Sequence, residues 1–213
     1  MIQLIFQQQY MAFVLISFAL IFSLTFHEYG HGKVASMIGD DTARNAGRLT
    51  LNPIPHIDPL GLLLVLLVGF GYAKPVPTDP RNFNTRWGVL LVAAAGPAMN
   101  LLLAVVAINL YQLGLNSGLS LFQGTGAYYF FTFFCLINML LMLINLLPIG
   151  PLDGHYILPY FLPRSMALNY MRINQRFGTY ALLLLIGLNF AGLPIVESIM
   201  KVGNSMLGFV TFL

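Results

Sequence analysis

Long apolar runs separated by short polar stretches divide the chain into helices that are long enough to cross a membrane. The first run predicts a helix from about Tyr10 to Met37, which ends where Gly39 and two aspartates follow. Farther along, no Lys, Arg, Asp or Glu occurs from Trp87 through Leu152. A hydrocarbon core about 30 Å thick needs about 20 helical residues, so this uncharged span is long enough for two crossings.

The uncharged span and the region after it predict three more helices. They cover about Arg86 to Leu115, Ala127 to Leu147 and Phe177 to Phe190. The tail from Pro194 to Leu213 is apolar enough to return through the bilayer. Glu197 and Lys201, four residues apart within it, are equally typical of an interfacial helix, so the sequence leaves both interpretations open.

A shorter apolar stretch, Leu60–Phe70, has positive charge on both sides and predicts a re-entrant or interfacial segment. Near it, Arg48–Asn52 and Phe70–Ala73 predict short extended segments close to the cytosol. We therefore predict an all-α membrane protein, a polytopic helical bundle of about 4–6 transmembrane segments with a short re-entrant or β-like cytosol-proximal segment. Without an internal repeat or a long polar linker, residues 1–213 are expected to form a single membrane-embedded domain.

Composition supports the same class. With 58% hydrophobic and 8% charged residues, the chain is far more apolar than soluble domains, in which about 25% of residues are charged. This balance and the long uncharged span exclude a soluble enzyme that is anchored by one helix. We expect an integral, multi-pass membrane protein that has the lipid bilayer as a partner and no nucleic acid.

Basic residues gather in three groups, which are expected to face the cytoplasm. The groups are Lys33, Arg44 and Arg48, then Lys74, Arg81 and Arg86, then Arg164, Arg172 and Arg176. The first ten residues and Leu113–Ala127 carry no charge, as expected for the opposite side. This pattern predicts that the N-terminus lies outside and that the first helix ends in the cytosolic interface. We expect the membrane to be the plasma (inner) membrane, with the active site toward the cytoplasm.

The residues His27-Glu28-Tyr29-Gly30-His31 form an H-E-x-x-H pattern in the cytoplasmic half of the first helix. Residues four apart differ by only about 40° around a helix, so His27 and His31 face the same way and can hold one Zn²⁺. Glu28, about 100° from His27, is better placed to hold a water molecule beside the metal. Such a short pattern also occurs by chance, but an acid in a membrane segment costs about 2.5–3.5 kcal/mol, which favours a functional role.

Catalytic zinc usually has three protein ligands, so the histidine pair requires a third donor. Asp153 is the strongest candidate, because the prolines and glycines of Asn145–Gly154 break the helix around it and let its carboxylate turn toward a metal. Two alternatives stay open. Asp153 is also a suitable cap for a short cytosolic helix, and His155 is a rival ligand.

A third polar cluster, Gly96-Pro97-Ala98-Met99-Asn100, begins about ten residues after Arg86 and therefore lies in the cytoplasmic half of its helix. Asn100 is suited to hydrogen-bond a substrate backbone or to help polarise its carbonyl, and an interhelical amide bond is the alternative role. His56 and Asp58 border the extended segments, where they either support the site or stabilise a loop.

These three motifs, in this order, resemble those of the site-2 protease family of intramembrane zinc metalloproteases. Weaker support comes from Leu51-Asn52-Pro53, His56-Ile57-Asp58-Pro59 and Lys74-Pro75-Val76-Pro77. The resemblance spans nearly the whole chain. It implies that residues 1–213 are a single membrane-embedded zinc metalloprotease domain, in the minimal form without a PDZ or nucleotide-sensing domain.

The resemblance also implies the chemistry of the site. One Zn²⁺ per chain would be bound by His27, His31 and Asp153, with Glu28 as the catalytic acid and base and a transmembrane protein as the substrate. Asn100 carries over as a catalytic residue less firmly. One departure is His155, which follows Asp-Gly where a small residue is expected.

Two other classes of membrane protein use similar residues. A metal-ion transporter needs ligands near the midplane of several helices and usually has repeated halves, and the sequence shows neither. A catalytically inactive scaffold of the same fold would lack Glu28 or a metal ligand, and all are present. The sequence predicts neither the substrate's identity nor the oligomeric state.

Overall fold

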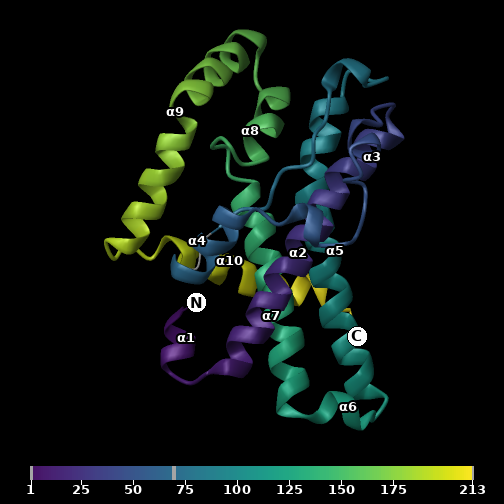
Figure 1. The fold of residues 1–213 in the computed structure, drawn as a ribbon, viewed down its shortest axis with the longest axis vertical. Helices are drawn as coiled ribbons and strands as arrows, with labels where there is room; N and C mark the ends of the chain where they lie inside the picture. The colour runs from purple at the N-terminus through teal and green to yellow at the C-terminus, as the bar shows by residue number, and fades with distance from the viewer. Residues whose placement is uncertain (1, 69–70, 213) are drawn as a thin grey trace.

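A computed structural model of the protein describes residues 2–68 and 71–212 (Figure 1). Three long helices form a bundle: α2 (Tyr10–Met37), α5 (Gly88–Asn116) and α7 (Thr125–Asn145). The bounds predicted from the apolar runs are confirmed to within two residues at each end. The short helix α1 (Ile2–Phe6) precedes α2, and the short helix α6 (Ser120–Gln123) lies in the connection from α5 to α7.

The bundle is held together by the contacts of α5 with α2 on one side and α7 on the other. Its interior contains small side chains that let the helices approach closely: Ala104 packs with Met139, and Ala107 packs with Ala19 and Phe134. Large apolar side chains such as Phe18 and Leu110 point outward and are exposed. Small residues inside and large apolar residues outside are what a lipid environment requires.

The C-terminal end of α2 is closed by a turn at Gly39, which has a φ of 104°. The amide of Gly39 donates to the carbonyl of Ser36, and the amide of Asp40 donates to that of Ala35 at 2.9 Å. These two bonds satisfy carbonyls that the helix end would leave unpaired, and a side chain at Gly39 would strain the required backbone. The glycine therefore determines where α2 ends.

Asp40 follows this turn and is fully buried. Its carboxylate accepts hydrogen bonds from the Asn82 side chain at 3.0 Å, from Thr42 and from the amide of Asp79 at 2.7 Å. Burial acts to raise the pKa of Asp40, but these hydrogen bonds outweigh it and hold the pKa below its ordinary value. Asp40 thus ties the end of α2 to the segment that leads into α5.

We expect Asp40→Ala to destabilise the metal-free protein at neutral pH by about 1–3 kcal/mol, since it leaves the partly buried donors of Thr42, Asp79 and Asn82 unpaired. Because the folded-state pKa is lowered, the contribution of Asp40 is present above the unfolded pKa of about 4 and is lost as pH falls through the folded value. Thermal unfolding in detergent from pH 7 to pH 3 measures this. The control is Asp41→Ala, which removes a half-exposed carboxylate beside Arg44 and should cost less. Equal effects of the two variants would contradict the assignment.

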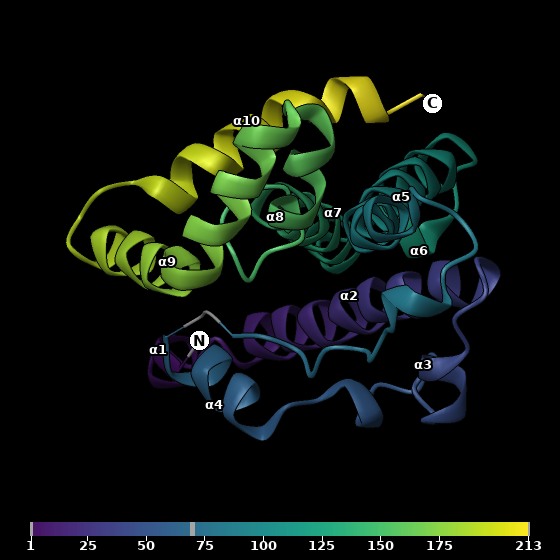
Figure 2. The same cartoon turned by 90° about the horizontal axis from the view of Figure 1, so that it is seen from above.

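The connection from α2 to α5 contains four short elements: α3 (Thr42–Asn45), η1 (Ile54–His56), α4 (Pro59–Val68) and η2 (Pro80–Asn82). Figure 2 shows α3 and α4 on the side of α2 that faces away from α5 and α7. At ten residues, α4 is too short to span a bilayer, as predicted for this stretch. Phe70, which ends one predicted segment and begins another, lies outside the described residues. Within the described ranges no strand forms, and residues 71–79 are irregular.

The C-terminal part contains α8 (Gly154–Ile157), η3 (Leu158–Phe161), α9 (Arg164–Phe190) and α10 (Ile195–Val210). The helix predicted from about Phe177 begins earlier, at Arg164. The prediction missed its first half because this half carries Arg172, Arg176 and other polar residues, which do not form an apolar run. A bend of 91° separates α9 from α10. Beyond this bend, α10 packs against α7.

The described residues contain three helices that are long and apolar enough to cross a membrane, α2, α5 and α7. Counting the bent pair α9 and α10 as one span gives up to four, the lower end of the predicted range. The protein is therefore an all-α integral membrane protein.

Candidate metal centre

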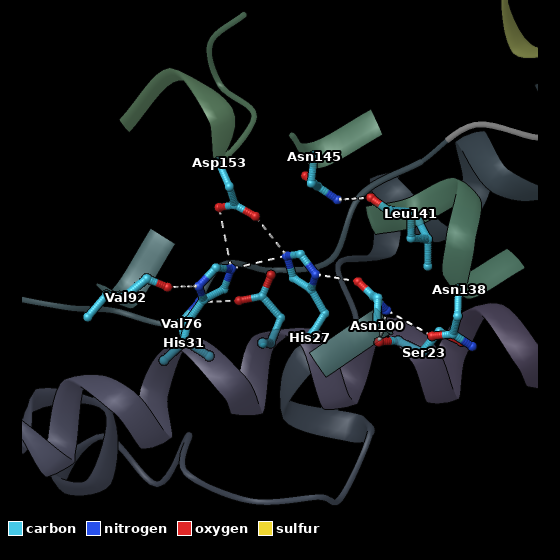
Figure 3. Close-up of polar contacts among 11 residues, drawn as sticks. Ser23, His27, His31, Val76, Val92, Asn100, Asn138, Leu141, Asn145 and Asp153 are labelled. Atoms are coloured by element: carbon cyan, nitrogen blue, oxygen red, sulfur yellow. Dashed lines mark hydrogen bonds and ion pairs between the residues drawn. The ribbon is translucent and has the colours of Figure 1, made fainter. Parts of the chain in front are cut away.

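Two residues of α2 and one residue from the loop before α8 converge beside the C-terminal half of α2 (Figure 3). His27 Nε2 lies 3.2 Å from Asp153 Oδ2, and His31 Nε2 lies 3.4 Å from Asp153 Oδ1. The two Nε2 atoms are 3.0 Å apart. Ligands about 2.0–2.2 Å from a tetrahedral metal are separated by roughly 3.3–3.6 Å, so this spacing is close to that of a zinc site.

The outer nitrogen of each imidazole faces an oxygen. His31 Nδ1 is 2.6 Å from the carbonyl oxygen of Val92, which can only accept, so this nitrogen is the one that carries the hydrogen. His27 Nδ1 is 2.6 Å from Asn100 Oδ1 and is a donor for the same reason. Each ring therefore turns an Nε2 lone pair inward, as a metal ligand must.

This arrangement provides a test of whether the residues fit a cation. Two nitrogen lone pairs and the Asp153 carboxylate face one another, and Asp153 Oδ2 is buried without a hydrogen-bond donor. Such a set of electron-rich atoms repels itself in a low-dielectric interior unless a positive charge lies between them. Two imidazoles and a carboxylate are also a common catalytic ligand set for zinc, so the residues fit Zn²⁺.

Gly96 of α5 supplies the space that the two imidazoles occupy. A Cβ added at this position would collide with the rings of His27 and His31. Gly30 of α2 plays a related part, because a Cβ there would lie 2.9 Å from the carbonyl oxygen of Ala95. The two glycines let α2 and α5 approach closely enough for the imidazoles to lie between them.

Glu28 is buried beside the histidines and accepts a hydrogen bond on Oε2 from the amide of Val76 at 2.8 Å. Val76 stands between Pro75 and Pro77, which have no amide hydrogen to offer. The Lys74–Pro77 motif was only supporting evidence at the level of sequence. In the structure it orients the carboxylate that is predicted to act as acid and base.

Asn100 is fully buried and directs its Oδ1 toward His27. Its Nδ2 donates to Asn138 Oδ1 at 2.9 Å and to the carbonyl of Ser23 at 3.3 Å. These contacts correspond to the interhelical amide bond that the sequence left as the alternative for this residue. A direct contact with substrate stays a prediction. Val92 and Asn138 were missed, because an apolar helix gives no signal of which carbonyl or amide faces a ligand.

Apart from Asp153, the other candidates His155, His56 and Asp58 lie outside this group of ligand atoms. Asp153 precedes α8 without a side-chain capping bond, so the capping alternative finds no support. The His155 ring packs at a tilt of 55° against the ring of Tyr156 instead. His56 is buried and bonds to the carbonyl of Thr50 at 2.9 Å, which is a contact within its own loop.

Asp58 has a local contact as well. Its Oδ1 accepts from the amide of Gly61 at 2.9 Å, in the first turn of α4. Both His56 and Asp58 thus make contacts of the loop-stabilising kind.

Comparison with known proteins gives consistent matches. The model for Peptidase family M50 matches residues 15–186. A Bacillus subtilis protein named "Putative zinc metalloprotease YwhC" is 45% identical over 147 residues, which are 68% of this chain and 67% of that protein. No solved structure matches the chain.

Two mycobacterial proteins named "Putative zinc metalloprotease Rip2" are more distant relatives. The one from Mycolicibacterium smegmatis is 32% identical over 148 residues, 67% of this chain and 55% of the relative. The one from Mycobacterium tuberculosis is 30% identical over 159 residues, 72% of this chain and 60% of the relative. The chain thus spans little more than half the length of these two proteins.

Proposed function

Because the chain belongs to peptidase family M50 and is an intramembrane zinc metalloprotease, we propose that it hydrolyses peptide bonds in or next to transmembrane segments of other membrane proteins. One observation carries this proposal. His27, His31 and Asp153 converge beside the buried carboxylate of Glu28 within a bundle of membrane-length helices. This is the donor set and the acid that peptide hydrolysis requires.

The residues have distinct roles in the proposed reaction. His27, His31 and Asp153 would hold the zinc, which when bound supplies Lewis-acid polarisation of a carbonyl and of water. Glu28 accepts the proton of the attacking water and passes it to the leaving amine. The Val76 amide already donates to Glu28 Oε2, so we assign the proton to Oε1, for which the smaller number of competing donors leaves more room.

A substrate helix hides its carbonyls in internal hydrogen bonds, so it must unwind before attack. We propose that the unwound substrate lies along residues 71–77. This irregular segment is held by the connection that follows α3, because the Lys74 amide donates to the carbonyl of His56 at 2.8 Å and Arg48 donates to the Lys74 carbonyl at 2.6 Å. Two residues later, the Val76 amide donates to Glu28, so a substrate lying along this segment would be next to the reacting groups.

An apolar cavity between α2 and α4 offers a place for the substrate's side chains. Six of its lining residues are Leu20, Ile21, Leu24, Leu62, Val65 and Leu66. The segment at Tyr72 and Ala73 forms another wall. The proposed substrate path therefore runs along one wall of this cavity.

The proposed orientation puts the N-terminus outside and the metal centre toward the cytoplasm of the plasma (inner) membrane. The C-terminal end of α2 and the starts of α5 and α9 lie at the same end of the molecule, opposite the α6 connection (Figure 1). The three basic groups belong to these segments and the loops beside them, as expected for the cytoplasmic side. This side also supplies the water that hydrolysis consumes.

The proposal is tested by reconstituting the full chain in lipid vesicles with a panel of single-pass membrane proteins and mapping products by mass spectrometry. We expect cuts within or beside transmembrane segments, which stop when a chelator removes zinc and return when zinc is restored. An unfolded soluble protein is the control substrate and should stay intact. Cutting of the soluble protein alone, or cutting that survives chelation, would contradict the proposal.

A further inference from the structure

Three side chains from three different helices form a connected series that ends at a metal ligand. Asn138 of α7 contacts Asn100 of α5, and Asn100 contacts His27 of α2 (Figure 3). Asn138 and Asn100 have no exposed surface. No feature of the sequence distinguishes Asn138, and the proposed reaction assigns it no part.

The direction of every hydrogen bond in this series is fixed from its far end. Asn138 bonds to the carbonyl of Phe134 at 2.8 Å, and since a carbonyl only accepts, the Asn138 amide nitrogen must face it. Asn138 Oδ1 then faces Asn100 and only accepts. Asn100 must therefore turn its nitrogen toward Asn138, which leaves its oxygen to face His27 Nδ1.

The last bond decides which nitrogen of His27 carries the hydrogen. With the Asn100 oxygen at 2.6 Å, Nδ1 is protonated and Nε2 presents its lone pair to Asp153 and His31. If the Asn100 amide were reversed, its NH₂ group would face Nδ1 and favour the tautomer that has its hydrogen on Nε2. That tautomer cannot bind a metal through Nε2.

We propose that Asn138 is a positioning residue of the metal centre, which acts through Asn100 to hold His27 in its metal-binding tautomer. The inference rests on the proposed ligand set. Without Asn138, the Asn100 nitrogen keeps only the carbonyl of Ser23, at 3.3 Å, so the amide loses the stronger of the two bonds that prevent its reversal.

The test measures zinc affinity of the purified full chain by competition with a chelator. Asn138→Leu has nearly the same shape and removes both hydrogen bonds. We expect zinc to bind about 10-fold more weakly, the lower end of the effect of outer-shell partners. Asn138→Ser is a second variant whose hydroxyl can still bond to Phe134 but is too short to reach Asn100, and it should weaken zinc binding in the same direction.

Asn109 provides a matched control on α5. Its amide nitrogen bonds to the carbonyl of Val105, four residues earlier, and to that of Val210, and its oxygen accepts from the Phe212 amide. Asn109→Leu therefore also removes an interhelical amide, but one outside the series. It should lower the unfolding temperature of the metal-free protein without changing zinc affinity.

A double-mutant cycle decides whether Asn138 acts through Asn100. In an Asn100→Leu background, Asn138→Leu should cause no further loss of zinc affinity. Zinc affinity within twofold of wild type in both Asn138 variants, or losses that add in the cycle, would overturn the inference. Failure of the wild-type protein to bind zinc would instead contradict the proposed function, so the two failures are distinguishable.

Discussion

Replacing Glu28 with glutamine should reduce peptide-bond cleavage by about 10²–10⁴-fold, the contribution typical of a general acid and base. The glutamine side chain has nearly the same shape and can still accept the Val76 amide hydrogen through its carbonyl oxygen. It has no carboxylate to receive a proton from water. Because Glu28 is not among the three converging ligand groups, zinc content should stay close to one per chain.

The measurement compares rates of product formation with zinc content in the same preparations. A control for loss of any acid is Glu197→Gln, which removes an exposed ion pair with Lys201 on α10. Its cleavage rate should match that of wild type. Cleavage by Glu28→Gln at more than a tenth of the wild-type rate would rule out Glu28 as the acid and base.

The second large effect is expected for Asp153→Asn, which should weaken zinc binding by more than about 100-fold, beyond the usual effect of outer-shell partners. The neutral amide is a poor zinc ligand. It also has no negative charge to balance the charge of the zinc ion that the two imidazole nitrogens would bind. Cleavage should be lost in proportion to zinc. Zinc content by elemental analysis and affinity by chelator competition measure the change.

Two variants make this result specific. Asp58→Asn keeps the oxygen that accepts from Gly61 at the start of α4, and its zinc affinity should not change. His155→Ala tests the rival ligand that the sequence left open, and it should retain zinc. Normal zinc in Asp153→Asn together with loss of zinc in His155→Ala would assign the third ligand to His155.

The long helices could be predicted from sequence because lipid imposes a simple requirement on length and polarity. Both ends of the helix from Tyr10 to Met37 were predicted correctly. Its apolar run stops next to Gly39, and a glycine at this position indicates the turn that ends the helix. The first half of α9 was missed for the converse reason. This half is polar, whereas a search for apolar runs finds only helices that lie in the hydrocarbon core of the membrane.

The convergence of the three side chains could be predicted from two features of the sequence, the spacing of the histidines and the helix break before the aspartate. A four-residue spacing put His27 and His31 on one face, and a break in the helix brought Asp153 toward them. The partners of these groups were not predictable, because they are backbone atoms or residues distant in sequence. Nothing in the sequence indicates that Val76 reaches Glu28, 48 residues away, or that Val92 reaches His31.

The order of the proposed ligands along the chain has a consequence for biosynthesis. His27 and His31 enter the membrane with the first long helix, whereas Asp153 follows the third. A nascent chain therefore contains α2, α5 and α7 before the aspartate is added. Until then it has two of the three proposed donors, so a chain that stops before Asp153 should not cleave its neighbours in the bilayer. Proteolytic competence arrives only when the last donor is translated.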